Sequence, residues 1–171
     1  MKNVNSINEL IKRFEEIVLE ESNLIRNGSI VALKHVATGK YLSSIKNLCY
    51  TTGSKSQLVF IGSSEPVPNS LWKIELGGEL ATYANNSIKL QHVKSESLLG
   101  IYSYYGRDYY KSPLNNYTEV GCRGGQVEFL RSHDIQFTIG NDTFQEVVCH
   151  NERLGGNDEW CIELIHEVKI F

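Results

Sequence analysis

The chain has 171 residues, enough for one domain, and its 17 Lys and Arg residues against 20 Asp and Glu residues give a net charge of −3. This balance argues against a nucleic-acid binder that depends on a basic surface, and no apolar run approaches the roughly 18 residues of a membrane span. The first residues lack the apolar core of a secretory signal, so we expect a cytoplasmic protein.

Residues 6–26 are predicted to form an amphipathic helix. Ser6 and Glu9 make a capping-box pattern at its start, and Gly28 lies where a helix stop is expected. Apolar residues recur between them at spacings of three and four: Ile7, Leu10, Ile11, Phe14, Ile17, Val18, Leu24 and Ile25. Such a stripe is explained either by packing against the chain's own domain or by docking onto a partner, including a homodimer through residues 6–26.

The pattern changes from residue 28 onward. Short runs of β-branched and aromatic residues, such as 30–33, 58–61 and 71–74, alternate with turns rich in Gly, Asn, Ser and Pro. Strands at spacings of about 8 to 12 residues indicate an all-β sandwich or barrel. We therefore divide the chain into a helical segment, residues 1–27, and a β domain, residues 28–171.

An internal repeat relates residues 41–76 to residues 129–164 at an offset of 88 positions. Nine of the 36 aligned positions are identical, where average composition would give about two. A shorter relation links Leu33-x-His35-Val36 to Leu90-x-His92-Val93, 57 positions further on. Three related units of strands in a chain of this size predict a β-trefoil, a barrel closed by hairpins.

Two sequence patterns resemble those of the MIR domain. Residues 33–42 read L-x-H-x-x-T-G-x-x-L and residues 130–133 read L-x-S-H, and the resemblance extends over residues 28–164. MIR domains occur in protein O-mannosyltransferases, inositol-trisphosphate and ryanodine receptors, and stromal-cell-derived-factor-type proteins. The resemblance implies a β-trefoil with a binding or scaffolding role and no catalysis, and it also implies a link to the secretory pathway.

The middle of the chain departs from this pattern. Residues 117–122 look like the third strand of unit two, yet only residues 123–126 separate them from the run at 127–130. A Trp-bearing fourth strand of unit two and a first strand of unit three do not fit into that interval. Alternatively, residues 117–122 are the first strand of unit three, and unit two is shortened. Either way we expect a compact or incomplete trefoil, with the helix or a second subunit covering the gap.

No catalytic motif is present, so we expect no enzymatic activity. His35 and His92 hold equivalent repeat positions, which favours a structural role such as bonding a turn carbonyl. Trp72 and Trp160 are likewise equivalent and have apolar neighbours, which favours the core over a sugar-binding platform. The four cysteines lack the spacing of zinc ligands, so neither a metal nor another cofactor is expected.

Candidate ligand contacts fall in two places. The most polar strand end of unit three matches the L-x-S-H pattern of the family and comprises Arg131, Ser132, His133 and Asp134. Unit two carries tyrosines around a Gly-bearing loop, a composition typical of contact surfaces, from which we select Tyr104, Tyr105 and Tyr109. The alternative for the tyrosines is a hairpin whose rings pack on both of its faces.

Two functions from different classes remain open. The first is a non-catalytic module that recognises a carbohydrate or protein ligand. The second is a structural interaction domain that assembles through its N-terminal helix. A more remote third alternative is a regulatory fragment of a glycosyltransferase, which would be inactive alone because it lacks membrane spans.

Overall fold

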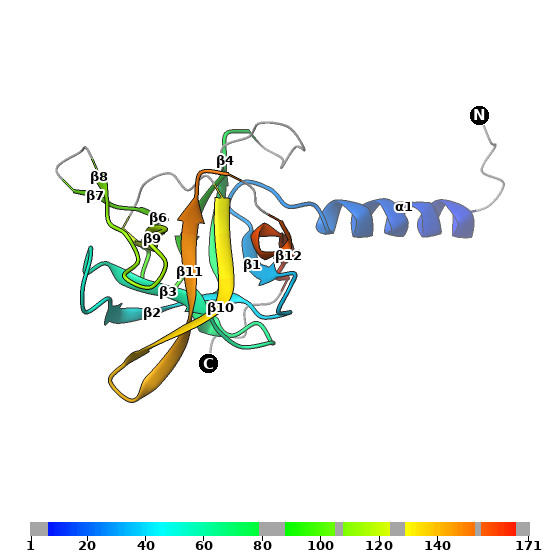
Figure 1. The fold of residues 1–171 in the computed structure, drawn as a ribbon. Coiled ribbons are helices and arrows are strands. Elements are labelled where there is room, and N and C mark those ends of the chain that lie inside the picture. The colour runs from blue at the N-terminus through cyan, green and yellow to red at the C-terminus, as the bar shows by residue number, and fades with distance from the viewer. Residues whose placement is uncertain (1–6, 79–87, 105–107, 124–128, 153–154, 167–171) are drawn as a thin grey trace.

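The structure is a computed structural model that describes residues 7–78, 88–104, 108–123, 129–152 and 155–166. One helix, α1 (Ile7–Ser22), precedes a body made of strands, as predicted (Figure 1). The strands of the described residues are β1 (Ile30–His35), β2 (Leu42–Cys49), β3 (Gln57–Ile61), β4 (Trp72–Leu76), β5 (Ile88–His92), β6 (Leu99–Ile101), β7 (Ser103–Tyr104), β8 (Asp108–Tyr109), β9 (Thr118–Cys122), β10 (Phe129–Ile139), β11 (Asp142–His150) and β12 (Trp160–Leu164). Two short 3-10 helices, η1 (Pro68–Ser70) and η2 (Gly156–Asp158), lie just before β4 and β12.

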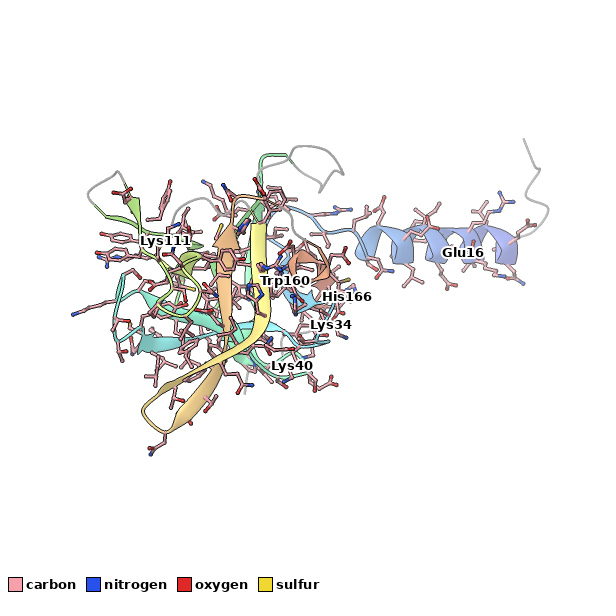
Figure 2. The ribbon with its side chains drawn as sticks, viewed as in Figure 1. Glu16, Lys34, Lys40, Lys111, Trp160 and His166 are labelled. Atoms are coloured by element: carbon pink, nitrogen blue, oxygen red, sulfur yellow. The ribbon has the colours of Figure 1, made fainter. Side chains whose placement is uncertain are left out.

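Helix α1 extends away from the β body (Figures 1 and 2). It buries no side chain, and its apolar stripe is open to solvent. The expectation that the helix packs against its own domain is therefore wrong, as is the idea that it covers a gap in the barrel. The helix also ends at Ser22 rather than at residue 26, and beyond it the chain turns so that Ile25 packs against the core.

The first and last strands of the β body lie side by side. A four-stranded antiparallel sheet has the order β12-β1-β4-β5, with Val31 opposite Leu164 and His35 opposite Trp160. A second sheet has the order β10-β11-β3-β9-β6, with β2 also paired to β3, and β7 and β8 form a separate hairpin. The ends of the β body are thus held together by direct strand pairing.

The four-stranded sheet ends on one side at β5 and on the other at β12. Strand β9 ends at Cys122 and β10 begins at Phe129, and the described part of that interval contains no strand. The two strands that a complete trefoil would place there thus have no counterpart in the described chain. The trefoil and the break in its second repeat both stay predictions.

Both tryptophans donate to backbone carbonyls at the equivalent place in their units. Trp72 Nε1 donates to the Leu42 carbonyl at 3.0 Å, and Trp160 Nε1 donates to the Leu130 carbonyl at 2.8 Å. Trp72 is fully buried in the main core, whereas Trp160 is partly buried at its margin. The predicted core position is confirmed for Trp72, and Trp160 packs against the same cluster.

Candidate functional site

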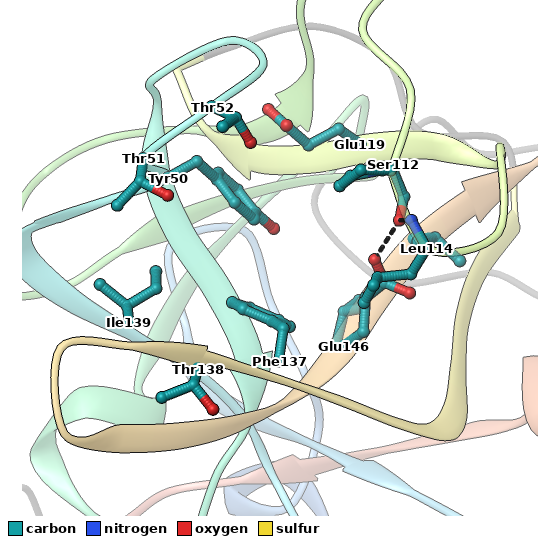
Figure 3. Close-up of a pocket in the computed structure, with 13 residues that line it drawn as sticks. Tyr50, Thr51, Thr52, Ser112, Leu114, Glu119, Phe137, Thr138, Ile139 and Glu146 are labelled. Carbon is teal, nitrogen blue, oxygen red and sulfur yellow. Dashed lines mark hydrogen bonds between the residues drawn. The ribbon is translucent and has the colours of Figure 1, made fainter.

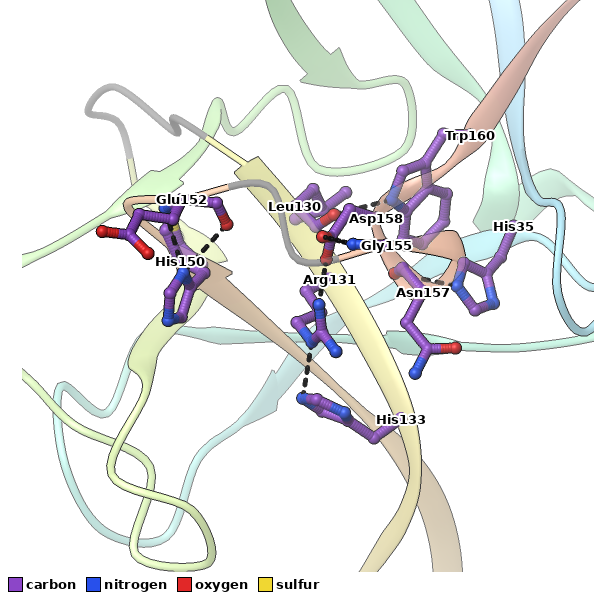
Figure 4. Close-up of polar contacts among 11 residues, drawn as sticks. His35, Leu130, Arg131, His133, His150, Glu152, Gly155, Asn157, Asp158 and Trp160 are labelled. Atoms are coloured by element: carbon purple, nitrogen blue, oxygen red, sulfur yellow. Dashed lines mark hydrogen bonds and ion pairs between the residues drawn. The ribbon is translucent and has the colours of Figure 1, made fainter.

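Arg131 joins two of its neighbours through its guanidinium group (Figure 4). Its Nη1 lies 2.7 Å from Asp158 Oδ1, and its Nε donates to His133 Nε2 at 3.2 Å. Arginine cannot accept a hydrogen bond, so His133 Nε2 is unprotonated and the ring is neutral with its proton on Nδ1. Burial, followed by the positive charge of Arg131, lowers the pKa of His133. Arg131 therefore fixes both the position and the tautomer of His133.

The ion pair between Arg131 and Asp158 is structural. The two side chains are only 11% and 0% exposed, and they tie β10 to η2. Asp158 also accepts the Gly155 amide at 3.1 Å. Removing one partner would leave a buried charge uncompensated, which is strongly destabilising.

The other two predicted contacts in unit three differ in accessibility. Ser132 is fully buried, and its hydroxyl donates to the Glu146 carbonyl at 2.8 Å. The same bond occurs in unit one, where Ser44 donates to the Leu58 carbonyl at 2.6 Å. Asp134 is exposed. The hydroxyl of Ser132 is thus committed to the fold, and only Asp134 of this pair is open to a ligand.

His133 lies in a set of three aromatic rings contributed by distant segments. Tyr117, just before β9, stacks on His133 with ring centroids 5.5 Å apart and an interplanar angle of 10°. The Tyr117 ring also meets His150, at the end of β11, edge to face at 4.8 Å and 76°. Residues 117, 133 and 150 are brought together because β9 and β10 both pair with β11.

A groove of about 440 Å³ opens beside Tyr117 and His150. We call it the tyrosine–histidine groove and define it by Tyr109, Lys111, Asn116, Tyr117, His150 and Asn151. Tyr109 is 48% exposed, so its ring is free to meet a ligand. Aromatic rings and side-chain amides thus line one accessible surface.

Local contacts hold the polar residues of the groove in place. Lys111 Nζ donates to Thr118 Oγ1 at 2.9 Å. Asn116 adopts a left-handed backbone conformation with φ 61°, and its backbone N–H donates to the Ser112 carbonyl at 3.0 Å. Lys111 and His150 are the basic residues of the described lining, which contains no carboxylate. The groove is therefore suited to a ligand with hydroxyl or other acceptor groups.

No protein-family model and no curated protein matches the sequence. Its fold matches an SDF2-like protein from Arabidopsis thaliana (TM-score 0.63, 22% identity, 81% of this chain and 94% of that one). It also matches a Caenorhabditis elegans protein of unknown function (TM-score 0.64, 17% identity, 82% of this chain and 96% of that one). A third match is the S. cerevisiae protein O-mannosyltransferase Pmt1–Pmt2 complex bound to the sugar donor (TM-score 0.64, 21% identity, 82% of this chain and 25% of that one). The chain has the MIR-domain fold. At these identities the likeness concerns the fold alone.

The tyrosines of unit two divide into different environments on this MIR fold. Tyr109 lines the groove, while Tyr104 belongs to β7, where its backbone pairs with Asp108. The predicted contact Tyr105 lies outside the described residues. Tyr102 and Tyr110 stack on each other with centroids 5.9 Å apart. The hairpin thus holds a stacked pair as well as the exposed ring of Tyr109.

Sequence reasoning missed five groove residues, namely Lys111, Asn116, Tyr117, His150 and Asn151. A signal for two of them was present. Tyr117 begins one predicted strand and His150 ends another, and the antiparallel pairing of these strands places Thr118 opposite Cys149. Pairing these third strands of units two and three in antiparallel fashion would have brought the two rings together. Lys111 and Asn116 carry no such signal, because neither of the two sequence repeats covers the connection between β8 and β9.

Two histidine–hydroxyl pairs resemble nucleophile–base pairs but are part of the MIR scaffold. His35 Nδ1 lies 3.0 Å from Thr38 Oγ1, and His92 Nδ1 lies 2.9 Å from Ser95 Oγ. In both histidines Nε2 faces a backbone carbonyl of a turn, at 3.1 and 3.2 Å, as predicted. The rings are fully buried. Across the described residues, no group of three or more His, Cys, Asp or Glu side chains is arranged to hold a metal ion.

Proposed function

We propose that the chain is a non-catalytic binding module whose tyrosine–histidine groove receives a carbohydrate. The groove combines the exposed ring of Tyr109 and the Tyr117 ring with the amides of Asn116 and Asn151. Sugars present C–H faces that pack on rings and hydroxyls that bond to amides, so this combination suits them. The exposed aromatic and amide lining is the observation that carries the proposal.

The chemistry of the groove supports binding rather than catalysis. His133 beside it is held neutral by the Arg131 Nε–H, and its Nε2 lone pair is already occupied. Proton transfer at a reacting bond needs an acid or base within reach, commonly a carboxyl group or a free imidazole. Among the described residues that line the groove there is no carboxylate, and the Nδ1 of His150 is engaged at 2.9 Å by the backbone of Glu152.

The direct test is a glycan array on the full chain, followed by calorimetry with the best oligosaccharide and with mannose oligosaccharides. The Tyr109→Ala variant removes an exposed ring of the groove, so we expect about a tenfold loss of affinity, which corresponds to about 1.4 kcal/mol. Asn151→Ala removes an amide from the same lining and is expected to weaken binding in the same direction.

Tyr102→Ala serves as the matched control, because Tyr102 is an exposed tyrosine of the same unit outside the groove lining. Its affinity for the oligosaccharide should equal that of the wild type. Failure of the wild-type chain to bind any glycan would overturn the carbohydrate proposal, as would equal losses in the Tyr102 and Tyr109 variants. A protein ligand for the same groove would then be the next alternative to examine.

A second function, assembly through α1, is favoured by one specific observation. The apolar stripe of the helix is exposed, with Phe14 67% and Ile17 54% accessible. A helix of 16 residues is marginal alone in water, and pairing with a second helix would stabilise it. No helix within the described ranges is long and apolar enough to cross a membrane.

Sedimentation equilibrium of the full chain tests this assembly. We expect a dimer that dissociates in the Phe14→Asp variant, since the charge would be buried in the helix pair. Glu16→Ser, on the polar face of the same helix (Figure 2), is the control and should remain dimeric. A wild-type chain that is monomeric at all concentrations would rule out homodimerisation through α1.

A further inference from the structure

A second cavity lies under the hairpins of the β body, apart from the tyrosine–histidine groove (Figure 3). We call it the hairpin cavity. Its volume is about 190 Å³, and it is formed by residues 50–52 after β2, residues 112–114 before β9 and residues 137–139 of the β10–β11 hairpin, together with Glu119 and Glu146. A cavity of about 150 Å³ accommodates benzene. The hairpin cavity therefore has room for a chain of a few heavy atoms.

Two buried carboxylates line this cavity. Glu119 and Glu146 are only 6% and 5% exposed. Glu119 accepts hydrogen bonds from the Ser54 hydroxyl and amide, and Glu146 accepts them from the Ser112 hydroxyl and from Asn115 Nδ2 at 2.6 Å. All of these donors are neutral. Neither carboxylate forms an ion pair with a residue that the structure describes.

Buried carboxylates without a cation are unusual, because hydrogen bonds alone seldom offset the loss of hydration. Burial raises the pKa of both groups, and the charge of Glu146 raises that of Glu119 further. The two negative charges thus act together on one small cavity. A positive group placed there would relieve both the desolvation and the repulsion.

Two aromatic rings form part of the remaining wall of the cavity, beside aliphatic and threonine side chains. The rings of Tyr50 and Phe137 lie nearly parallel, with centroids 6.2 Å apart and an interplanar angle of 26°. The Tyr50 hydroxyl points into the protein and donates to the Val120 carbonyl at 2.8 Å. Aromatic faces attract organic cations and pack against aliphatic stems. The cavity therefore complements a ligand that is apolar along its length and positive at its end.

The arrangement of acceptors favours a compact cation over a planar one. A guanidinium group binds best to a carboxylate whose two oxygens are free for a bidentate contact. Both oxygens of Glu146 already accept hydrogen bonds, one from Ser112 and the other from Asn115. An ammonium group needs only single lone pairs from separate carboxylates.

We propose that the hairpin cavity binds a primary alkylammonium group, with the charge between Glu119 and Glu146 and the stem against Tyr50 and Phe137. The group is the end of a lysine side chain or a free alkylamine. This site is independent of the groove proposed for carbohydrate, so either proposal can fail without affecting the other.

The test is an NMR titration of the full-length chain at mildly alkaline pH, where an alkylammonium ion keeps its charge. The probes are n-butylammonium chloride, n-butanol as the uncharged analogue, and Nα-acetyl-lysine methylamide. We expect n-butylammonium to shift the resonances of residues around Tyr50 and Phe137 and to bind at least tenfold more tightly than n-butanol. Equal affinity for the alcohol and the ammonium ion would overturn the proposal.

Variants of the two carboxylates test whether n-butylammonium binds between them. Glu119→Gln keeps the one oxygen that accepts both hydrogen bonds from Ser54, and Glu146→Gln keeps one of the two accepting oxygens. Each variant removes the charge and should weaken n-butylammonium binding about tenfold, the loss of one charge-assisted contact. Glu65→Gln removes an exposed carboxylate outside the cavity and is the control. Undiminished binding in a folded Glu119→Gln/Glu146→Gln variant would refute the assignment. If that variant does not fold, the comparison of n-butylammonium with n-butanol on the wild type decides.

The lysine derivative distinguishes the two sources of the ammonium group. Binding of Nα-acetyl-lysine methylamide at the same resonances, with affinity close to that of n-butylammonium, supports a lysine side chain of a protein partner as the occupant. Binding of n-butylammonium alone supports a free amine, because a peptide backbone would then be excluded from the mouth of the cavity.

Discussion

The two tryptophans make the same hydrogen bond at different depths. Trp72 is fully buried, so Trp72→Phe would leave the Leu42 carbonyl without its donor, at a cost of about 2 kcal/mol. Trp160 is partly exposed, and water can replace its bond to the Leu130 carbonyl. We expect Trp160→Phe to cost only about 1 kcal/mol. Urea unfolding of both variants measures the difference, and equal losses would contradict this role of burial.

Glu119 and Glu146 also predict how stability depends on pH. Burial is the main cause that raises the pKa of both carboxyl groups above their ordinary value of 4.5, and neighbouring hydrogen bonds oppose it. Between that value and the raised one, the folded chain holds more protons than the unfolded chain. The free energy of unfolding contributed by these groups therefore falls as pH rises above about 4.5.

Thermal unfolding of the wild type and of Glu119→Gln/Glu146→Gln from acidic to mildly alkaline pH checks this sign. We expect the variant to gain stability relative to the wild type as pH rises. Burial raises the pKa of nearby Tyr50 far above this range, so that group does not titrate within it. The difference between the two proteins also removes the opposite contribution of His133, whose pKa is lowered. A difference that is constant with pH would refute the prediction.

At the level of elements, α1 and the segment that follows it should contribute very differently to stability. Helix α1 buries no side chain, so deleting residues 1–22 is expected to change the free energy of unfolding by less than about 0.5 kcal/mol. Deleting residues 1–27 also removes Ile25, which packs against the core, and Asn27, whose Oδ1 accepts the Leu76 amide at 2.9 Å. We expect the longer deletion to cost at least about 2 kcal/mol. Urea unfolding of both truncated chains tests the contrast.

Strand β12 should show alternating amide protection. The Ile165 amide donates to the Ile30 carbonyl, and Val36 donates to the Glu159 carbonyl. Successive residues of a strand direct their backbone amides to opposite sides. The amides of Cys161 and Glu163 therefore face β1, as that of Ile165 does, whereas those of Ile162 and Leu164 face away from it.

We therefore expect hydrogen exchange at Ile162 and Leu164 to be much faster than at Cys161 and Glu163. The outer edge of β12 has no partner strand within the residues described. Strong protection of the Ile162 amide would show that another segment or a second molecule covers this edge. Exchange measured by NMR on dilute protein distinguishes these outcomes.

For the whole molecule, repeated features were predictable from sequence and features of single units were not. The 88-residue offset placed Trp72 correctly, and the short interval before Phe129 is the basis for predicting a shortened second repeat. The direction of α1 could not be predicted, because an apolar stripe has the same period whether it faces its own domain or solvent. The groove around Tyr117 depends on strand pairing between units, which single-strand patterns do not encode.

The pairing of β1 with β12 has a consequence for synthesis of the chain. His35 bonds the Asn157 carbonyl, and the Tyr41 hydroxyl donates to Glu163 at 2.6 Å, both across 122 residues of sequence. At the usual pace of translation, β1 leaves the ribosome on the order of ten seconds before its partner strand. During that interval β1 pairs only with β4, through Val31, and Leu33, buried in the finished protein, lacks the strand that lies opposite it. A cell that makes this protein must keep the nascent strand from associating with others until the last strand arrives.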